Sequence, residues 1–497
     1  MEDKEKEKDL KELKSSRTDY STSLRKKKYD EFILKSRHGS NDQKYSIKKN
    51  QIIVREEYKD ISFNTLLDLL LFSSKVFQDI NSNINDIRFI IYIINQTKIK
   101  KDIKEEVNES NILLSIANIF PKYINDIVIV DELLSILINF TFYLNPETNM
   151  NLITNDYMKI YSAISSQYFN DNIIFNDLII LLGNLANDNP SAQKIFYNTK
   201  LFDEIYNLSQ NEKAPKNKKD IAIFFLANFS KGIGKNNDLV KNVNILKNLV
   251  DIMCDNIIKE EYNKICIVSL GELSTIKELG EYIVLKKEIF DFIYNNKNTE
   301  FYWAINRILV NLTFVNDKIN LFMIENYKSQ IFPYINTLLN SNSKIILGQG
   351  LFLLGNIIEN EPCKINEIIK EAGFYDKIFE NLDSSFNDIL DPVIFIINVI
   401  VNSSDKVDIF KLFQRNIHLK LLNILKNNYN REIINKAVDA LIDFLLKDTQ
   451  DKIIKQNLKE NGIKEIFMNL NIDRNDAELY LKVEEIIKMF DKNYIRL

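Results

Sequence analysis

The sequence predicts an all-α protein made of about ten helical repeats, and three observations support this fold class. The 497 residues include only 11 Gly and 7 Pro, which favours helices joined by short polar loops over a fold with many tight turns. Apolar segments of helical length alternate with polar loops along the chain. Finally, an element of the form apolar-x-Asn-apolar recurs about every 44 residues.

The recurring element defines what we call the asparagine row, whose members each end an apolar segment: Asn139, Asn184, Asn228, Asn311, Asn356 and Asn398. The intervals are 45, 44, 83, 45 and 42 residues, with Glu272 near the midpoint of the double interval and Asp443 a further 45 residues on. A period of about 40–47 residues with two or three helices per unit is typical of armadillo and HEAT repeats. We therefore expect an armadillo-repeat, right-handed superhelical solenoid with one long concave groove. Gly373 and Gly462 are expected to end helices.

Charge divides the chain into two regions. Residues 1–50 carry a net charge of +5, and the remainder carries −9. We expect a mostly disordered basic N-terminal arm at 1–56 (core 17–50) and an armadillo-repeat domain at 57–497, with the last repeat at about 450–492. The arm either contacts the acidic body or an acidic partner, or it is a solvated tail, and charge alone leaves both open.

Several classes of function are disfavoured. The three cysteines and two histidines have no metal-ligand spacing, so we expect no metal, cofactor or catalytic residue. The apolar runs are shorter than a membrane span, and we expect no membrane insertion. GIGKNN at 232–237 lacks the spacing of a phosphate-binding loop. The acidic body makes a direct nucleic-acid role for the Lys26–Lys28 run an unlikely main function.

The asparagine row suits the groove, where side-chain amides can bind the backbone of an extended peptide. For any single Asn, a hydrogen bond to the next loop within the repeat is an equally open alternative. Four residues before the row positions, on the same helix face, lie Ser135, Ile180, Phe224, Val268, Arg307, Phe352 and Ile394. With Asp188, Asp317 and Asp391 nearby, apolar walls and acidic ends would suit long basic side chains. Ordinary core packing is the alternative for the apolar members.

Four stretches carry a resemblance to a known family. They are SLRKKKYDEFILKSRHG (23–39), LLGNLANDNP (181–190), RILVNLTFVND (307–317) and DPVIFIINV (391–399). They resemble the importin-beta-binding segment and the groove motifs of the importin-alpha (karyopherin-alpha) family. The resemblance covers residues 17–492 at low identity. It implies an adaptor without enzymatic activity that binds Lys/Arg-rich nuclear localisation signals.

The resemblance also implies roles for individual residues. The major peptide-binding groove would contain Asn139, Thr148, Asn184, Asp188, Phe224 and Asn228, and the minor groove would contain Arg307, Asn311, Asp317, Phe352, Asn356, Asp391 and Asn398. The importin-beta-binding and autoinhibitory arm would use Leu24, Arg25, Lys26, Lys28, Leu34, Lys35 and Arg37.

By the same resemblance, the partners would be importin-beta, cargo proteins with basic localisation signals, and a nuclear export receptor with Ran-GTP. The protein would then shuttle between cytoplasm and nucleus. The chain departs from the family in lacking every groove Trp, and its one Trp, Trp303, lies one turn before Arg307 outside the array. The alternative function is a general armadillo scaffold that binds another extended partner.

Overall fold

The computed structural model describes residues 58, 61–79, 82–97, 103–259, 262–296, 301–315, 317–359, 373–403, 406–427, 430–448, 453–470 and 477–490. These residues form helices, turns and loops, and no strand occurs among them. The predicted arm, with Leu24, Arg25, Lys26, Lys28, Leu34, Lys35 and Arg37, lies outside the described residues.

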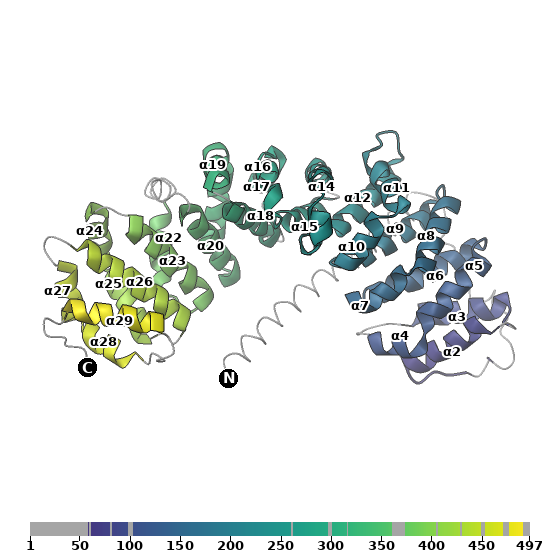
Figure 1. Ribbon diagram of the computed structural model, residues 1–497, viewed down its shortest axis with the longest axis horizontal. Helices are drawn as coiled ribbons and strands as arrows, with labels where there is room; N and C mark the ends of the chain where they lie inside the picture. The colour runs from purple at the N-terminus through teal and green to yellow at the C-terminus, as the bar shows by residue number, and fades with distance from the viewer. Residues whose placement is uncertain are drawn as a thin grey trace. The chain divides into compact units, whose positions relative to one another are not determined.

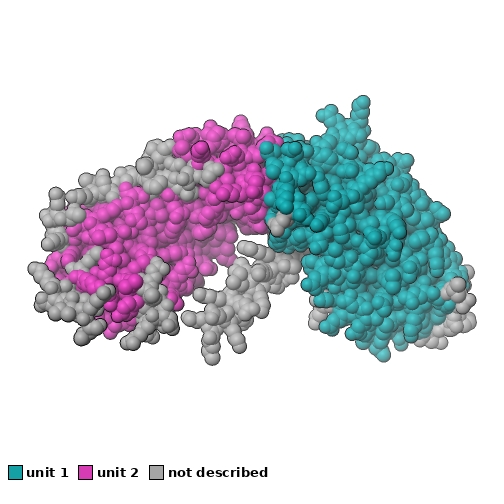
Figure 2. All heavy atoms as spheres, viewed as in Figure 1, with its two compact units in different colours: residues 1–273 teal, residues 274–497 magenta. Residues whose placement is uncertain are grey.

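The chain divides into two compact units, residues 1–273 (unit 1) and 274–497 (unit 2) (Figure 2). Unit 1 contains α2 (Leu66–Gln78), α3 (Ile84–Gln96), α4 (Lys104–Ser110), α5 (Ile112–Tyr123), α6 (Ile127–Thr141), α7 (Pro146–Asn149), η3 (Met150–Ile153), α8 (Asn155–Gln167), α9 (Asn172–Ala186), α10 (Pro190–Tyr197), α11 (Lys200–Gln210), α12 (Lys216–Ser230), η4 (Ile233–Lys235), α13 (Asn237–Val240), α14 (Val243–Ile257) and α15 (Asn263–Leu273).

Unit 2 contains η5 (Lys277–Leu279), α16 (Gly280–Val284), α17 (Lys287–Asn295), α18 (Tyr302–Val315), α19 (Asp317–Leu339), α20 (Lys344–Glu359), α22 (Phe374–Glu380), η8 (Asn381–Asp383), α23 (Asn387–Ser403), α24 (Lys406–Gln414), α25 (Ile417–Asn427), α26 (Arg431–Lys447), α27 (Ile453–Glu460), α28 (Ile463–Asn469) and α29 (Ala477–Phe490). Within α19 the backbone leaves the helical region at Tyr327, so this element is two helices joined at a kink.

A three-helix repeat runs through both units, with a short first helix, a second helix and a third helix. The helices α10, α11 and α12 form one such repeat in unit 1, and α24, α25 and α26 form one in unit 2 (Figure 1). Each third helix packs on the next: α6, α9, α12 and α15 in unit 1, and α18, α20, α23, α26 and α29 in unit 2. This arrangement confirms the predicted all-α armadillo class.

Local sequence signals set where these helices begin and end. Asp126 and Asp171, 45 residues apart, each accept two backbone N–H groups at the start of a third helix. Gly462 (φ +75°) follows α27 and precedes α28, as predicted. Gly373 also adopts a left-handed φ of +69° before α22. Glycine meets no steric penalty in this conformation, so the chain turns sharply at both points.

Burial of the third helices supplies the core. In α9, every residue from 174 to 186 is buried, and in α12 every residue from 221 to 230 is buried. Buried polar groups bond across repeats, as in Tyr157, whose hydroxyl donates to the Leu113 carbonyl at 2.5 Å. Burial raises the pKa of Tyr157 far above its ordinary value, so the hydroxyl keeps its proton for this bond.

A pair of glycine substitutions tests how closely the third helices pack. A Cβ on Gly348 of α20 would lie 2.6 Å from the Asp388 carbonyl oxygen, which belongs to backbone. We expect Gly348→Ala to lower the stability of unit 2 by about 1–3 kcal/mol through overpacking. The matched control is Gly183→Ala in α9, where the nearest atom is a side-chain nitrogen at 3.4 Å. This control should be neutral or gain up to about 1 kcal/mol of helix propensity. Thermal unfolding followed by circular dichroism measures both, and equal effects would contradict the packing described.

A second prediction concerns His418, which is fully buried in α25. Its ring stacks on Phe413 and its Nε2 lies 2.9 Å from the Asn457 Oδ1. Burial lowers the pKa of His418 below its ordinary value, although the bond to Asn457 opposes this effect. The folded state therefore binds the proton more weakly than the unfolded chain. The stability that this residue contributes is full above pH about 6.5 and is lost as pH falls through the lower folded pKa.

We expect the melting temperature of unit 2 to fall by about 3 °C between pH 7.5 and pH 5.5, and His418→Gln to remove most of that fall. The only other histidine in the chain is His38, which makes His38→Gln the matched control. Scanning calorimetry at the two pH values measures the difference. A His418→Gln protein with the wild-type pH dependence would rule out this histidine as the cause.

Candidate peptide-binding face

The asparagine row occupies equivalent places on successive third helices. Asn139, Asn184 and Asn228 are each the third residue from the end of α6, α9 and α12. Asn311, Asn356 and Asn398 lie in the last six residues of α18, α20 and α23. Glu272 and Asp443 continue the row on α15 and α26. The sequence period therefore reflects one recurring structural position.

In unit 1 the row is largely enclosed. Asn184 is buried and donates through Nδ2 to the Thr141 hydroxyl at 3.1 Å. Asn228 is fully buried, and its Oδ1 accepts from the Lys231 Nζ at 3.0 Å. Its Nδ2 is buried without a hydrogen-bond partner. Asn139 is half-buried, whereas Thr148, whose backbone N–H donates to the Asn145 Oδ1, is buried.

In unit 2 the row is more open. Asn311 is half-buried and donates to the Ser274 Oγ at 2.9 Å. Asn398 is half-buried and donates to the Lys436 carbonyl at 3.0 Å, while its Oδ1 is buried without a partner. Asn356 is buried, and its Nδ2 has no partner. Several amides of the row therefore bond within the repeats, as the alternative expects, and the half-buried Asn139, Asn311 and Asn398 are the members that a ligand can reach in part.

The residues four before the row also differ between the units. The Phe224 ring is 1% exposed, and Ile180, Val268 and Ile394 are likewise buried. In contrast, Phe352 on α20 is 41% exposed, and Arg307 on α18 is half-buried. Burial of Phe224, Ile180, Val268 and Ile394 favours ordinary core packing as their role. Phe352, in contrast, is an aromatic side chain that a ligand can contact. The side chain of Asp317 lies outside the description, although its backbone begins α19.

Asp188 is held by the loop of the next repeat. Its φ is +52°, unusual for a residue other than glycine, and its N–H donates to the Lys231 carbonyl. A Cβ on Gly232 would lie 2.5 Å from the Asp188 Oδ1, so only glycine allows this approach. Lys235 then pairs with the same Oδ1 at 2.8 Å. The GIGKNN stretch therefore contributes a turn and a lysine to the joint with the preceding repeat.

Asp391 is held in a similar pair. Lys436 of α26 donates to the Asp391 Oδ1 at 2.7 Å and to the Glu432 Oε1 at 3.3 Å. Burial works against the charge of Lys436, but Asp391 and Glu432 together raise its pKa above the ordinary value. The lysine is thus firmly cationic at neutral pH and forms an ion pair with Asp391.

A further pair lies one repeat on. Lys482 of α29 lies 2.9 Å from the Asp439 Oδ1 and donates to the Asn435 Oδ1 at 3.1 Å. Burial, and then the charge of Asp439, raise the pKa of neighbouring Asp443, while Lys447 and Asn402 oppose the rise. These pairs were missed at the level of sequence. The sequence feature that could have revealed them is a separation of about one repeat between the partners. It is 47 residues for Asp188 and Lys235, 45 for Asp391 and Lys436, and 43 for Asp439 and Lys482.

Another acidic set escaped the sequence analysis. Asp131, Asp177 and Asp220 lie on α6, α9 and α12, seven or eight residues before Asn139, Asn184 and Asn228. That spacing is two helical turns, so they share a face with the asparagine row. Asp131 and Asp177 are buried, and Asp220 is half-buried. The third helices of unit 1 therefore carry acidic residues at the repeat period.

The side chains that remain accessible define what we call the unit 2 face: Trp303, Arg307, Asn311, Phe352, Asp391, Phe395, Asn398, Asp439 and Asp443. They come from α18, α20, α23 and α26, which pack on one another in that order. Several of the residues predicted for the minor groove are thus brought together. Those predicted for the major groove lie on unit 1, where Asp188 is exposed and Asn139 is half-buried.

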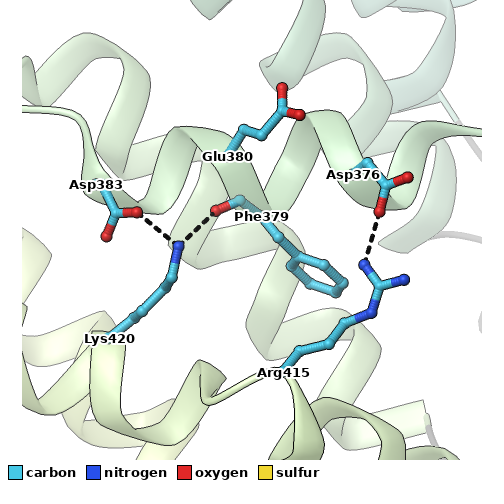
Figure 3. A pocket seen from close by; sticks show the side chains of 6 residues that line it. All are labelled: Asp376, Phe379, Glu380, Asp383, Arg415 and Lys420. Carbon is cyan, nitrogen blue, oxygen red and sulfur yellow. Dashed lines mark hydrogen bonds and ion pairs between the residues drawn. The ribbon is translucent and has the colours of Figure 1, made fainter.

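A surface hollow of about 450 Å³ lies elsewhere, against α22, η8 and the start of α25 (Figure 3). It is lined by Asp376, Phe379, Glu380, Asp383, Arg415 and Lys420. Arg415 pairs with Asp376 at 2.7 Å, and Lys420 pairs with Asp383 at 2.6 Å. Because both cations are compensated by the preceding repeat, the hollow is a joint between repeats and carries no uncompensated cation for a ligand.

Two further kinds of site are absent from the described residues. Among them, no group of three or more His, Cys, Asp or Glu side chains is placed to hold a metal ion. No helix in the described part of the chain is both long and apolar enough to cross a membrane.

Comparisons with known proteins support the fold. No protein-family model and no curated protein sequence matches this chain. A crystal structure of an engineered protein is similar over 85% of this chain and 98% of its own, with a TM-score of 0.67 and 13% identity. A computationally designed armadillo repeat protein for modular peptide recognition covers 50% of this chain with all of its own length, at a TM-score of 0.42 and 16% identity. Another designed armadillo repeat protein gives a TM-score of 0.41 at the same identity and coverage.

Phe224 and Phe352 each lie four residues before a member of the asparagine row, and their different exposure predicts different roles. We expect Phe224→Ala to destabilise unit 1 by about 3–5 kcal/mol, since it removes a buried ring. Phe352→Ala, on an exposed ring of the unit 2 face, should change stability by less than about 1 kcal/mol. Urea unfolding followed by circular dichroism measures both. A small effect of Phe224→Ala would mean that its ring is not part of the packing.

Proposed function

We propose that this protein is an armadillo-type adaptor that binds an extended cationic peptide along its third helices. The observation that carries the proposal is that carboxylates on the third helices, or just after one, each bind a lysine side chain. Asp188 pairs with Lys235, Asp391 with Lys436, and Asp439 with Lys482. The repeat spacing therefore already presents carboxylates in a geometry that suits a primary ammonium group.

The unit 2 face supplies the other contacts that such a peptide needs. Asn311 and Asn398 are half-buried, and a peptide backbone would compete there with the bonds that their amides make to Ser274 and to the Lys436 carbonyl. The exposed Phe352 ring offers an apolar surface for the stem of a Lys or Arg side chain. Asp391 lies near the start of α23 and Asn398 near its end, so charge and backbone contacts alternate along the face.

The finer proposal is a nuclear import adaptor. It rests on the resemblance of residues 23–39 and of the three groove stretches to importin-alpha. In this function Lys35 and Arg37 of the arm compete with cargo for the groove, and Lys26 and Lys28 contribute to importin-beta binding. Cargo with a basic localisation signal would be released in the nucleus, and an export receptor with Ran-GTP would return the protein to the cytoplasm.

A general scaffold is the second candidate, and a specific observation favours it. The apolar residues Ile180, Phe224 and Ile394, four before row positions, are buried, and the predicted carboxylates Asp188 and Asp391 are already paired with lysine. Because these carboxylates are already paired, the surface would suit a ligand with fewer cationic residues. The two functions would use the same side chains for the ligand and differ in whether the N-terminal arm regulates binding.

The test is fluorescence anisotropy with a labelled Lys-rich peptide, titrated with the full chain and with residues 51–497. We expect Asp391→Asn and Asp188→Asn each to weaken binding by about tenfold, as for loss of a hydrogen bond to a charged group. The matched control is Asp376→Asn. It removes the same charge from an inter-repeat ion pair on α22, away from the third helices, and should leave affinity unchanged. Binding should weaken as salt is raised.

The arm separates the two functions. For an import adaptor, residues 51–497 bind the peptide more tightly than the full chain, because the arm competes at high effective concentration. Added importin-beta should then raise the affinity of the full chain to that of the truncated form. If the full chain and residues 51–497 bind the peptide equally, with and without importin-beta, the general scaffold is the better explanation. Absence of peptide binding to both forms would contradict the cationic-peptide proposal itself.

A further inference from the structure

Two of the three carboxylates that the sequence analysis assigns to basic ligand side chains are each paired with a lysine of this chain. Lys235 Nζ lies 2.8 Å from Asp188, and Lys436 Nζ lies 2.7 Å from Asp391. In both cases the lysine comes from the following repeat. The pair of Asp439 and Lys482, at 2.9 Å, has the same form in unit 2. A cationic ligand therefore meets carboxylates that already have a partner.

These pairs differ in how well they are shielded from water. Lys235 and Asp188 are 67% and 55% exposed, so solvent screens their attraction strongly. Lys436 and Asp391 are 29% and 35% exposed, and Lys482 and Asp439 are 23% and 38% exposed. The unit 2 pairs are the stronger ones because less water surrounds them. Displacing a lysine should cost more in unit 2 than at Asp188.

The geometry points to Lys436 and Lys482 as intramolecular competitors that set the affinity of the unit 2 face for cationic residues. This inference rests on the proposed function. A ligand ammonium group competes with the Lys436 Nζ for Asp391, and with the Lys482 Nζ for Asp439. Binding is therefore an exchange of one lysine for another, and the affinity depends on how strongly the internal lysine is held.

The contacts of Lys436 show where its side chain goes during this exchange. It already bonds Glu432 of its own helix at 3.3 Å, four residues earlier, and Glu432 is 73% exposed. When a ligand takes Asp391, Lys436 retains Glu432 as its partner and moves toward solvent. Lys482 has the neutral Asn435 Oδ1 as its second partner.

Removing the internal lysines tests the inference with the full chain and the same labelled Lys-rich peptide. Lys436→Met keeps much of the aliphatic stem and removes the charge. We expect it to tighten binding about threefold to fivefold, the exchange cost of one partly exposed pair. Lys482→Met should give a similar gain, because the two pairs are similarly exposed, and the double variant should gain about tenfold. The gain should shrink in high salt.

Two controls separate competition from net charge. Lys436→Arg keeps a cation beside Asp391 and should bind within twofold of wild type. Lys420→Met removes an equivalent lysine, paired with Asp383 at 2.6 Å, but lies on α25 in the hollow of Figure 3. A Lys436→Met gain no larger than that of Lys420→Met would overturn the inference. Lys436→Gln, a polar neutral variant, repeats the test if Lys436→Met folds poorly.

The outcomes also separate this inference from the proposed function. If the wild-type chain binds the peptide and Asp391→Asn weakens it, but neither lysine substitution changes affinity, the function stands and the competition is refuted. If Asp391→Asn binds as wild type does, the proposed site is wrong, whatever the lysine variants do. A gain in Lys436→Met that disappears in the Lys436→Met, Asp391→Asn double variant would support competition at this carboxylate.

Discussion

The stacking of each third helix on the next is the constraint on which the rest of the structure depends. A single repeat cannot bury its own apolar side chains, so each relies on its neighbours. Residues 174–186 of α9 are all buried by this packing. Polar groups on such helices must then find partners about one repeat away, as Asn184 does at Thr141 and as the Ser269 hydroxyl does at the Ala227 carbonyl. The sequence period and the hydrogen-bond pattern have the same physical cause.

The same constraint governs charge. A carboxylate on one repeat faces the side chains of the next, and a lysine there lowers the cost of placing that carboxylate at a partly buried position. Lys436 and Lys482 do this in unit 2. A groove built from stacked repeats therefore compensates its own charges unless the sequence prevents it. A cationic ligand on such a surface would compete with the internal lysines for these carboxylates. The free energy gained from each carboxylate would then be the difference between the ligand pair and the internal pair.

Much of the fold could be predicted from the sequence because stacking imposes a period on it. The asparagine row located the ends of the third helices, and Gly462 marked a helix boundary correctly. Exposure could not be predicted in the same way. Phe224 and Phe352 occupy equivalent sequence positions, yet one is buried and the other is exposed. A four-residue spacing predicts which face of the helix a side chain lies on. Its exposure depends on which neighbouring helices pack against that face. The lysine partners were missed since motif comparison looks for ligand-binding residues and not for their internal partners.

Exchange between internal and ligand lysines also bears on specificity. When one ion pair replaces another, part of the charge term cancels, and the remaining affinity depends more strongly on contacts that the internal lysine does not make. On the unit 2 face these are the Phe352 ring and the backbone contacts offered by Asn311 and Asn398. An extended peptide provides both a stem and a backbone, whereas a free cation provides neither. Under the proposed function, paired carboxylates would therefore select against isolated cations and favour a continuous basic segment.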